Sequence, residues 1–297
     1  MNAIEIPVEF QSGGCQLFGI IHRPAIPNRR GVVILTGGNR CGPHRWFVLQ
    51  AREWAMAGYP VLNISTRGTG DSEGTYDGID SVEADLSSAI DEFFRREPGL
   101  EEVVLWGVCF HASEALLYSP KDSRVAAVVL VNLYLETDLY LLDPLSGQSL
   151  PMQRTVAMTY LRYVFARVST LDFWKQMPVL RNSIDWNVAP RRLGRQLLIA
   201  LGIKNGKSVA KPHASCLSDQ LLEAFREFRG RVLLILSGSD LDANIVRNLL
   251  NTQTWSEARC LNRTTIHELR EADHMFSRRA WSDQASTWTL EWLKSWQ

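Results

Sequence analysis

Cys109 occupies a position from which its side chain could attack a substrate. It lies in the segment VLWGVCFH at 104–111, where an apolar run typical of a buried strand meets the start of an expected helix. A sharp turn at such a junction lifts one side chain above the end of a sheet, and its usual pattern is G-x-S-x-G. Here Cys109 takes the serine position. Because free N–H groups and the dipole at a helix start favour a thiolate, we predict a nucleophile rather than a structural cysteine.

A nucleophilic cysteine needs a base, and the base needs a carboxylate to orient it. Asp240 and His274 each follow, within a few residues, an apolar segment typical of a strand. The loops after parallel strands meet at one edge of the sheet, where the active sites of open α/β sheets form. We therefore predict a triad of Cys109, His274 and Asp240. Asp242 is the alternative acid, and Asp240 is preferred because it comes sooner after its strand.

The other histidines fit the position of the base less well. His22 and His267 fall inside patterns typical of strands, whereas His44 and His213 fall in expected loops. His274 lies in the loop between the last expected strand and the last expected helix, which is where a base of this kind belongs. We therefore assign the role of the base to His274.

Acyl transfer also needs two N–H groups that face the developing negative charge. Phe110, directly after the nucleophile, can supply one of them. The Gly-Gly-Asn loop at 37–39 can supply the other, because small residues let the backbone approach a substrate closely. The N–H of Asn39 is preferred and that of Gly38 is the alternative. His111 replaces the second glycine of the turn pattern. One interpretation is an accessory polar group, and the alternatives are that it caps the pocket or that the turn is distorted.

Neither a cofactor nor a metal is expected. The glycine-rich loop RGTGDSEG at 67–74 lacks the lysine of a phosphate-binding loop, so we expect a structural turn there. The five cysteines lie far apart and none forms a C-x-x-C pair, so the spacing suggests neither a disulfide framework nor a zinc site.

Alternating strands and helices must position these residues. The expected strands are 4–10, 16–22, 31–36, 59–64, 102–107, 124–132, 232–236 and 264–270. The expected helices are 46–57, 81–96, 112–118, 217–228, 243–250 and 281–296. Because the strands are apolar throughout and alternate with helices, we predict an α/β fold with a mostly parallel central sheet that is flanked by helices on both faces.

The alternation fails between residues 133 and 215, where aromatic residues and prolines replace the strand pattern. We predict that 133–215 is a helical lid or cap insertion, and that 1–132 and 216–297 together form the core.

The expected lid is basic, although the whole chain is neutral with 32 basic and 32 acidic residues. Between residues 151 and 212 there are eleven lysines and arginines, Arg154, Arg162 and Lys175 among them, against two aspartates. One interpretation is a solvated helical face. The other is a surface for an anionic partner, such as an acyl carrier protein or coenzyme A.

The composition excludes several classes of protein. Zero net charge argues against a globally basic nucleic-acid binder, and 45% hydrophobic with 22% charged residues is typical of a folded globular chain. The longest apolar stretch, 125–135, is about half as long as a membrane helix, and MNAIEIPVEF lacks the basic start and apolar core of a secretory signal. We expect a cytoplasmic protein with no transmembrane segment and no nucleic-acid partner.

Taken together, the motifs resemble those of the α/β-hydrolase superfamily. The loop R-G-x-G-x-S-x-G at 67–74, the turn at 107–111, S-G-S-D at 237–240 and D-H at 273–274 occur in the same order. The resemblance covers nearly the whole chain outside the expected lid, and it implies an α/β-hydrolase fold and acyl chemistry.

More narrowly, the chain is similar to hydrolases that are associated with the exosortase A system. Those carry a GG loop followed by an H-R-x-F segment, here at 37–38 and 44–47. Their nucleophile turn has the style G-L-C-D-G-A-S, here GVCFHAS, and their acid loop S-G-x-D-L-T-A is SGSDLDA here. This chain departs from them at Phe110-His111, in place of Asp-Gly, and at Asp242, in place of Thr.

The resemblance implies that the protein is an acyl hydrolase or acyltransferase that works through a covalent intermediate on a small-molecule acyl substrate. A thiolate nucleophile would form an acyl thioester, which thiols and amines attack readily. This chemistry favours acyl thioesters, bound to a carrier or to coenzyme A, over simple esters. Because a fold of this kind hosts many functions, the alternative is a non-catalytic ligand-binding protein on the same scaffold.

Overall fold

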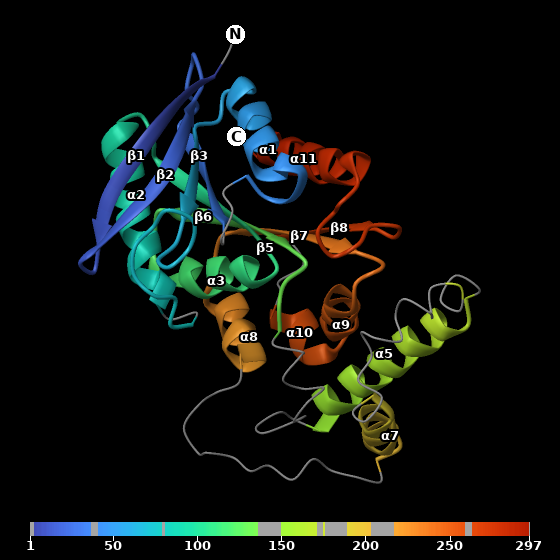
Figure 1. The fold of residues 1–297 in the computed structure, drawn as a ribbon. Helices are drawn as coiled ribbons and strands as arrows, with labels where there is room; N and C mark the ends of the chain where they lie inside the picture. Colours follow the sequence, from blue (N-terminus) through green and yellow to red (C-terminus); the bar gives the residue numbers. More distant parts are fainter. Residues whose placement is uncertain are drawn as a thin grey trace.

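The computed structural model centres on one mixed β-sheet with helices on both faces (Figure 1). The structure describes residues 3–36, 41–78, 81–135, 150–170, 175, 189–202, 217–258 and 263–296.

Within these residues the sheet has eight strands, in the order β1-β2-β4-β3-β5-β6-β7-β8. The pairs β1–β2 and β2–β4 are antiparallel, and every other pair is parallel. The strands are β1 (Ile4–Ser12), β2 (Cys15–Arg23), β3 (Arg30–Thr36), β4 (Val61–Ser65), β5 (Glu102–Val108), β6 (Val125–Val131), β7 (Arg231–Ser237) and β8 (Thr264–Leu269). The expected mostly parallel sheet is confirmed.

The pattern of burial explains why the middle strands are mostly apolar. All residues of β3 are buried, and β5, β6 and β7 each contain one residue that is not. Parallel strands in the middle of a sheet have both faces covered by helices, so most of their side chains are apolar. The edge strand β1 instead alternates exposed and buried residues over its second half.

The helices form two layers around two apolar cores. The helices are α1 (Trp46–Met56), α2 (Val82–Arg96), α3 (Phe110–Tyr118), α5 (Leu150–Val168), α7 (Ala189–Ala200), α8 (Leu217–Glu227), α9 (Leu241–Leu250), α10 (Gln253–Ala258) and α11 (Arg279–Lys294). One core contains buried residues of α2, α3, α8, α9 and α10, and the other contains those of α1 and α11 (Figure 1). Helices therefore cover both faces of the sheet, as expected.

One helix starts earlier than the sequence predicts, and one helix was not predicted. The helix expected at 112–118 begins already at Phe110, directly after Cys109. The short helix α10 was not expected, because its six residues are too few to show a helical period. The other described strands and helices match the expected ones to within about two residues at most ends, which is the usual uncertainty of such boundaries.

Two helices, α5 and α7, lie within the expected lid segment and pack against each other beside α9 (Figure 1). The amide of Asn248 in α9 donates to the hydroxyl of Thr159 in α5 at 2.8 Å. Leu133 and Leu135, at the start of the same segment, are buried in the core of the sheet. The helical character of the segment is thus visible in its described part, while its action as a lid stays a prediction.

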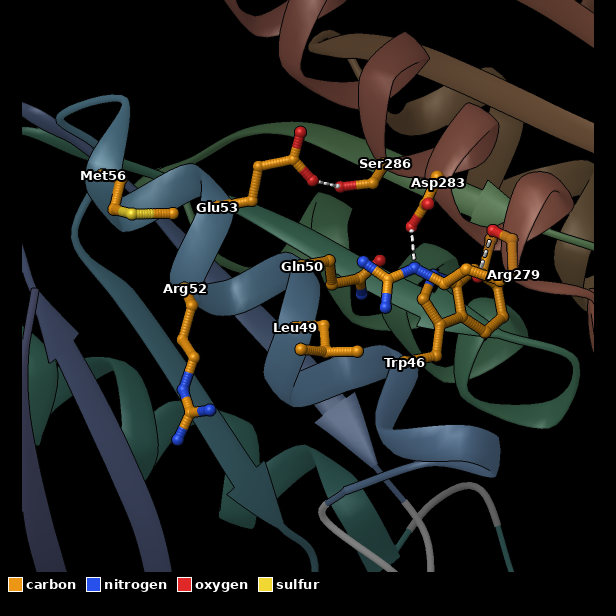
Figure 2. Close-up of a pocket in the computed structure, with 10 residues that line it drawn as sticks. Trp46, Leu49, Gln50, Arg52, Glu53, Met56, Arg279, Asp283 and Ser286 are labelled. Atoms are coloured by element: carbon orange, nitrogen blue, oxygen red, sulfur yellow. Dashed lines mark hydrogen bonds and ion pairs between the residues drawn. The ribbon is translucent and has the colours of Figure 1, made fainter.

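On the other face of the sheet, α1 and α11 lie side by side. The Ser286 hydroxyl of α11 donates to the Glu53 carboxylate of α1 at 2.6 Å, as Figure 2 shows, and the Trp54 indole donates to the Ser286 carbonyl at 3.3 Å. A pocket of about 300 Å³ lies between these helices, and the candidate site residues do not line it. None of the described helices is long and apolar enough to cross a membrane.

Gly107, in β5, lies close against the backbone of α3. A Cβ at residue 107 would lie 2.5 Å from the carbonyl carbon of His111 and 2.7 Å from the amide nitrogen of Ala112, so only glycine fits there. We expect Gly107→Ala to reduce the free energy of unfolding by about 1–3 kcal/mol, because the clash is with backbone atoms. Urea unfolding of the purified variant measures this change.

Gly99→Ala is the matched control, since a Cβ at residue 99 meets no atom within 4 Å. This variant should stay within about 0.5 kcal/mol of the parent protein. Equal stability of the two variants would contradict the close approach at Gly107.

Candidate active site

Cys109 sits in the turn between β5 and α3 with a strained backbone. Its φ is 57° and its ψ is −120°, and it is the N-cap residue of α3. The amide of Cys109 donates to the Val131 carbonyl of β6 at 2.8 Å, and its own carbonyl accepts from the Ala112 amide at 3.0 Å. A positive φ is uncommon for residues other than glycine and is found mostly where surrounding packing enforces it. The Cys109 side chain is thereby raised at the carboxyl end of β5, half-buried.

Asp240 follows β7 and caps helix α9. Its Oδ2 accepts a hydrogen bond from the Ala243 amide at 3.0 Å, and the residue is 9% exposed. A carboxylate at this position is stabilised by the free N–H groups of the first turn. The same oxygen lies 3.1 Å from Nδ1 of His274. One carboxylate therefore serves both the helix and the imidazole.

His274 links Asp240 to Cys109. Hydrogen bonds to Asp240 and, second, to Cys109 raise the pKa of His274 to about 10, although burial opposes this. A ring with this pKa carries a positive charge at neutral pH. The structure thus brings all three residues of the expected triad together, and Asp240 is the carboxylate that the ring contacts.

Asn132, at the end of β6, holds the loops of this group in place. Its side-chain amide donates to the His274 carbonyl at 2.7 Å and to the Ser237 hydroxyl at 2.9 Å. Its Oδ1 accepts from the Ser237 amide at 2.8 Å, so these bonds join the end of β6 to the end of β7 and to the loop after β8. Asn132 is fully buried with a φ of 47°, and our reading of the sequence did not single it out.

Aromatic rings support the site from the side of α1. Trp46, the first residue of α1, lies 5.4 Å from Trp106 of β5 and 5.5 Å from Phe276, measured between ring centroids. Phe276 follows His274 by two residues. The loop that carries His274 is therefore packed against the helix that begins the opposite layer.

The oxyanion donors are placed only in part. Phe110 is the first residue of α3, so its N–H has no acceptor within the helix and is available to a substrate oxygen. Gly38 and Asn39, expected to supply the second donor, lie outside the described residues. The second donor stays a prediction.

A pocket of about 280 Å³ opens beside Cys109. Its described lining comprises Gly42, Pro43, Phe47, Val108, Cys109, Phe110, His111 and Met275. Most of these side chains are apolar, so the pocket suits the hydrocarbon part of a small substrate.

His111 faces this pocket and is held by a carboxylate from the next turn of α3. Its Nδ1 lies 2.6 Å from Oε2 of Glu114, and the Tyr76 hydroxyl donates to Oε1 of the same carboxylate at 3.2 Å. His111 was expected to be an accessory polar group, whereas Glu114 and Tyr76 were not expected at all. The i,i+3 spacing of His111 and Glu114 on a helix was the available signal for this pair.

Asp242 lies close to both Asp240 and His274. One ligand atom each from Asp240, Asp242 and His274 lie within 4.8 Å of one another, a grouping that could hold a cation. A metal would have to displace the proton from His274, whose pKa is raised to about 10, before that ring could be a ligand. The charge on His274 therefore favours an acid–base role for this group over a metal centre.

The glycine-rich loop after β4 forms a hydrogen-bonded turn. The Arg67 guanidinium donates to Asp85, which is fully buried in α2, at 2.6 Å, and the Ser72 hydroxyl donates to the Ser65 carbonyl at 2.8 Å. These bonds tie the loop to the core and match the structural turn that was expected there.

Several solved structures share this architecture. An esterase of Pyrococcus furiosus aligns with a TM-score of 0.61 at 14% sequence identity, over 99% of this chain and 92% of that chain. An acylaminoacyl peptidase of Pyrococcus horikoshii aligns with a TM-score of 0.57 at 15% identity, over 99% of this chain and 41% of that chain. A proline iminopeptidase of Mycobacterium smegmatis aligns with a TM-score of 0.56 at 11% identity, over 98% of each chain.

The sequence matches no protein-family model and no curated protein sequence. At these low identities the structural likeness concerns the fold alone. The chain has the α/β-hydrolase fold, with its mostly parallel sheet flanked by helices.

The charge on His274 gives a testable pH dependence. Asp240→Asn weakens the larger of the two interactions that raise the pKa of His274, so that pKa should fall from about 10 towards the ordinary 6.5. NMR titration of the histidine ring resonances measures it. His267, whose pKa burial holds below its usual value, lies elsewhere and should keep its titration unchanged. A wild-type His274 that titrates near 6.5 would refute the assigned charge state.

The raised pKa of His274 also makes the free energy of unfolding fall at high pH. Because the pKa of His274 is higher in the folded protein than the ordinary 6.5, its protonation stabilises the fold fully below pH 6.5. This contribution is lost as the pH rises through about 10. The Asp240→Asn variant should lose less stability than the wild type over that interval.

Proposed function

We propose that the protein is a cysteine-dependent acyl hydrolase or acyltransferase. The observation that carries this proposal is the hydrogen-bonded series of Cys109, His274 and Asp240 beside an apolar pocket. A nucleophile, a base and an orienting carboxylate are the groups that covalent acyl transfer needs.

The first half-reaction forms an acyl-enzyme. At neutral pH the proton shared by this pair lies on His274, and the resulting imidazolium stabilises the Cys109 thiolate. The thiolate attacks the acyl carbonyl and a carbon–sulfur bond forms, while the oxyanion rests on the N–H of Phe110 and on a second donor from Asn39 or Gly38. The bond to the leaving group then breaks, and the leaving group takes the proton from His274.

The second half-reaction releases the acyl group. Water, or an amine, hydroxyl or thiol acceptor, gives a proton to His274 as it attacks the acyl thioester. The new tetrahedral intermediate collapses, the carbon–sulfur bond breaks and the Cys109 thiolate is regenerated. Asp240 keeps the ring oriented in both halves and stabilises its positive charge.

Cysteine chemistry favours acyl thioesters as substrates. Attack of one thiolate on a thioester exchanges two leaving groups of similar stability, so the acyl-enzyme is reached without a large energetic penalty. The similarity of the GG loop, the nucleophile turn and the acid loop to hydrolases of the exosortase A system is further support for the same class of chemistry.

The basic character of the segment 151–212 supports a carrier-bound or coenzyme A-bound acyl donor. Arg154, Arg162 and Lys175 are exposed in the described part of this segment. Both carriers present phosphate groups, which a surface of this charge attracts. The protein would thus take an acyl group from a phosphopantetheine thioester.

Intact-protein mass spectrometry after incubation with a panel of acyl thioesters tests the mechanism. An acyl mass increment, or released acid for a fast hydrolase, should occur in the wild type. Both should be lost in Cys109→Ala, because the group that forms the covalent bond is gone. Positioned acid–base catalysis contributes roughly 10²–10⁴-fold, so His274→Ala should be strongly impaired as well.

Cys15→Ala is the matched control for this experiment, since Cys15 lies in β2 outside the pocket and is also partly buried. It should behave as the wild type does. If no substrate of the panel gives an adduct or a product, the proposed enzymatic activity is refuted. The alternative of a non-catalytic binding protein is then favoured.

Charge reversal tests the anionic donor. Changing Arg154, Arg162 and Lys175 together to Glu should raise KM for acyl-coenzyme A or an acyl carrier about tenfold, because three exposed attractions become repulsions. KM for a short thioester without phosphates should stay the same. Equal KM changes for both donors, or no change for either, would contradict a role for these residues in carrier binding.

A further inference from the structure

A second imidazole–carboxylate pair lies beside Cys109. Nδ1 of His111 lies 2.6 Å from Oε2 of Glu114, whose side chain is 1% exposed. The hydroxyl of Tyr76 donates to the other carboxylate oxygen at 3.2 Å, so both oxygens of Glu114 have partners. A buried, hydrogen-bonded carboxylate fixes the orientation of the ring that it contacts. Glu114 therefore orients His111 as Asp240 orients His274.

The bond to Glu114 decides which ring nitrogen is available. Because Nδ1 of His111 is engaged, Nε2 is the nitrogen that can meet a ligand. In the part of the chain that the structure describes, Glu114 is the hydrogen-bond partner of this ring. The His111 side chain is 18% exposed, and it lines the same pocket as Cys109.

The wall of this pocket is otherwise apolar. Among its described lining residues, Pro43, Phe47, Val108 and Met275 offer no polar side chain. A few fixed polar groups in an apolar pocket are what orients and selects a ligand. The volume of about 280 Å³ is small compared with the roughly 300–1,000 Å³ of most ligand pockets, which suits a short acyl chain.

We propose that His111, held by Glu114, selects short acyl groups that carry a hydroxyl on the second or third carbon. The inference rests on the proposed acyl transfer at Cys109, and it names the substrate class of that site. His274 remains the base of the reaction, and His111 determines specificity by binding the substituent. Cys109, which attacks the carbonyl, and His111 line the same small pocket. The hydroxyl must therefore lie on a carbon close to the carbonyl.

A hydroxyl matches Nε2 in either protonation state of the ring. It can donate to an unprotonated Nε2 and accept from a protonated one, whereas a carboxylate can only accept. A plain alkyl chain would cover Nε2 and leave it without a partner. A buried polar atom without a partner destabilises a complex by more than one hydrogen bond stabilises it. The pocket therefore both attracts the hydroxyacyl group and rejects its alkyl analogue.

Matched substrates test this inference. The kcat/KM of the wild type is measured with N-acetylcysteamine thioesters of butanoate, 2-hydroxybutanoate and 3-hydroxybutanoate, which share chain length and leaving group. For at least one hydroxyacyl thioester, kcat/KM should be about tenfold higher than for the butanoyl thioester. A difference of this size corresponds to the contribution of one good hydrogen bond. In His111→Ala this ratio should fall to about one, whatever the absolute rates.

Two further variants separate binding from structure. His111→Gln keeps a hydrogen-bonding side chain and should retain part of the preference. His267→Ala removes a histidine that stacks on Trp288 in α11, and it should retain the full ratio.

Each result is decisive for the hydroxyacyl assignment. Wild-type protein that turns over all three thioesters at similar kcat/KM overturns it without any variant, even if His111→Ala fails to fold. A preference that survives in folded His111→Ala overturns it too. In both cases the observed turnover leaves the proposed acyl transfer intact. If no thioester gives turnover or an adduct, acyl transfer itself is refuted, and the hydroxyacyl assignment is refuted with it.

Discussion

The strained turn at Cys109 is the constraint on which the rest of the site depends. A non-glycine residue at positive φ costs about 1–3 kcal/mol and persists only where the surroundings over-determine it. Here the surroundings are a buried strand before the turn, a helix after it, and Gly107, which lets the two backbones approach. The turn directs the thiol out of the sheet and leaves the Phe110 N–H at a helix start. The proposed nucleophile and the proposed oxyanion donor thus depend on one backbone conformation.

Four neighbouring strands deliver the groups of the site. At their carboxyl ends, β5, β6, β7 and β8 are followed by Cys109, Asn132, Asp240 and His274. Because the strands are parallel and hydrogen-bonded side by side, four distant chain segments end at one edge of the sheet. The Asn132 side chain joins the ends of β6 and β7 to the loop after β8. The proposed triad is therefore supported by hydrogen bonds from a residue outside it.

Two imidazole rings meet the pocket region with different partners. His274 is charged because Asp240 and Cys109 raise its pKa to about 10, which suits the proposed transfer of a proton to a leaving group. His111 is tied to a buried glutamate on its own helix and lines the pocket beside Cys109. We therefore propose different roles for the two rings: His274 moves a proton and His111 recognises a substituent.

The sequence by itself determined the alternation of strands and helices, the order of Cys109, Asp240 and His274, and the loop in which each lies. These features depend on local patterns, namely apolar runs, helical periods and the residue types that follow a strand. Only the tertiary structure decided that Asp240 contacts the His274 ring, that Asn132 bonds both Ser237 and the His274 carbonyl, and that Tyr76 bonds Glu114. Hydrogen bonds between residues far apart in the chain depend on strand register and loop conformation at the scale of an ångström, and no local pattern of residues encodes that geometry.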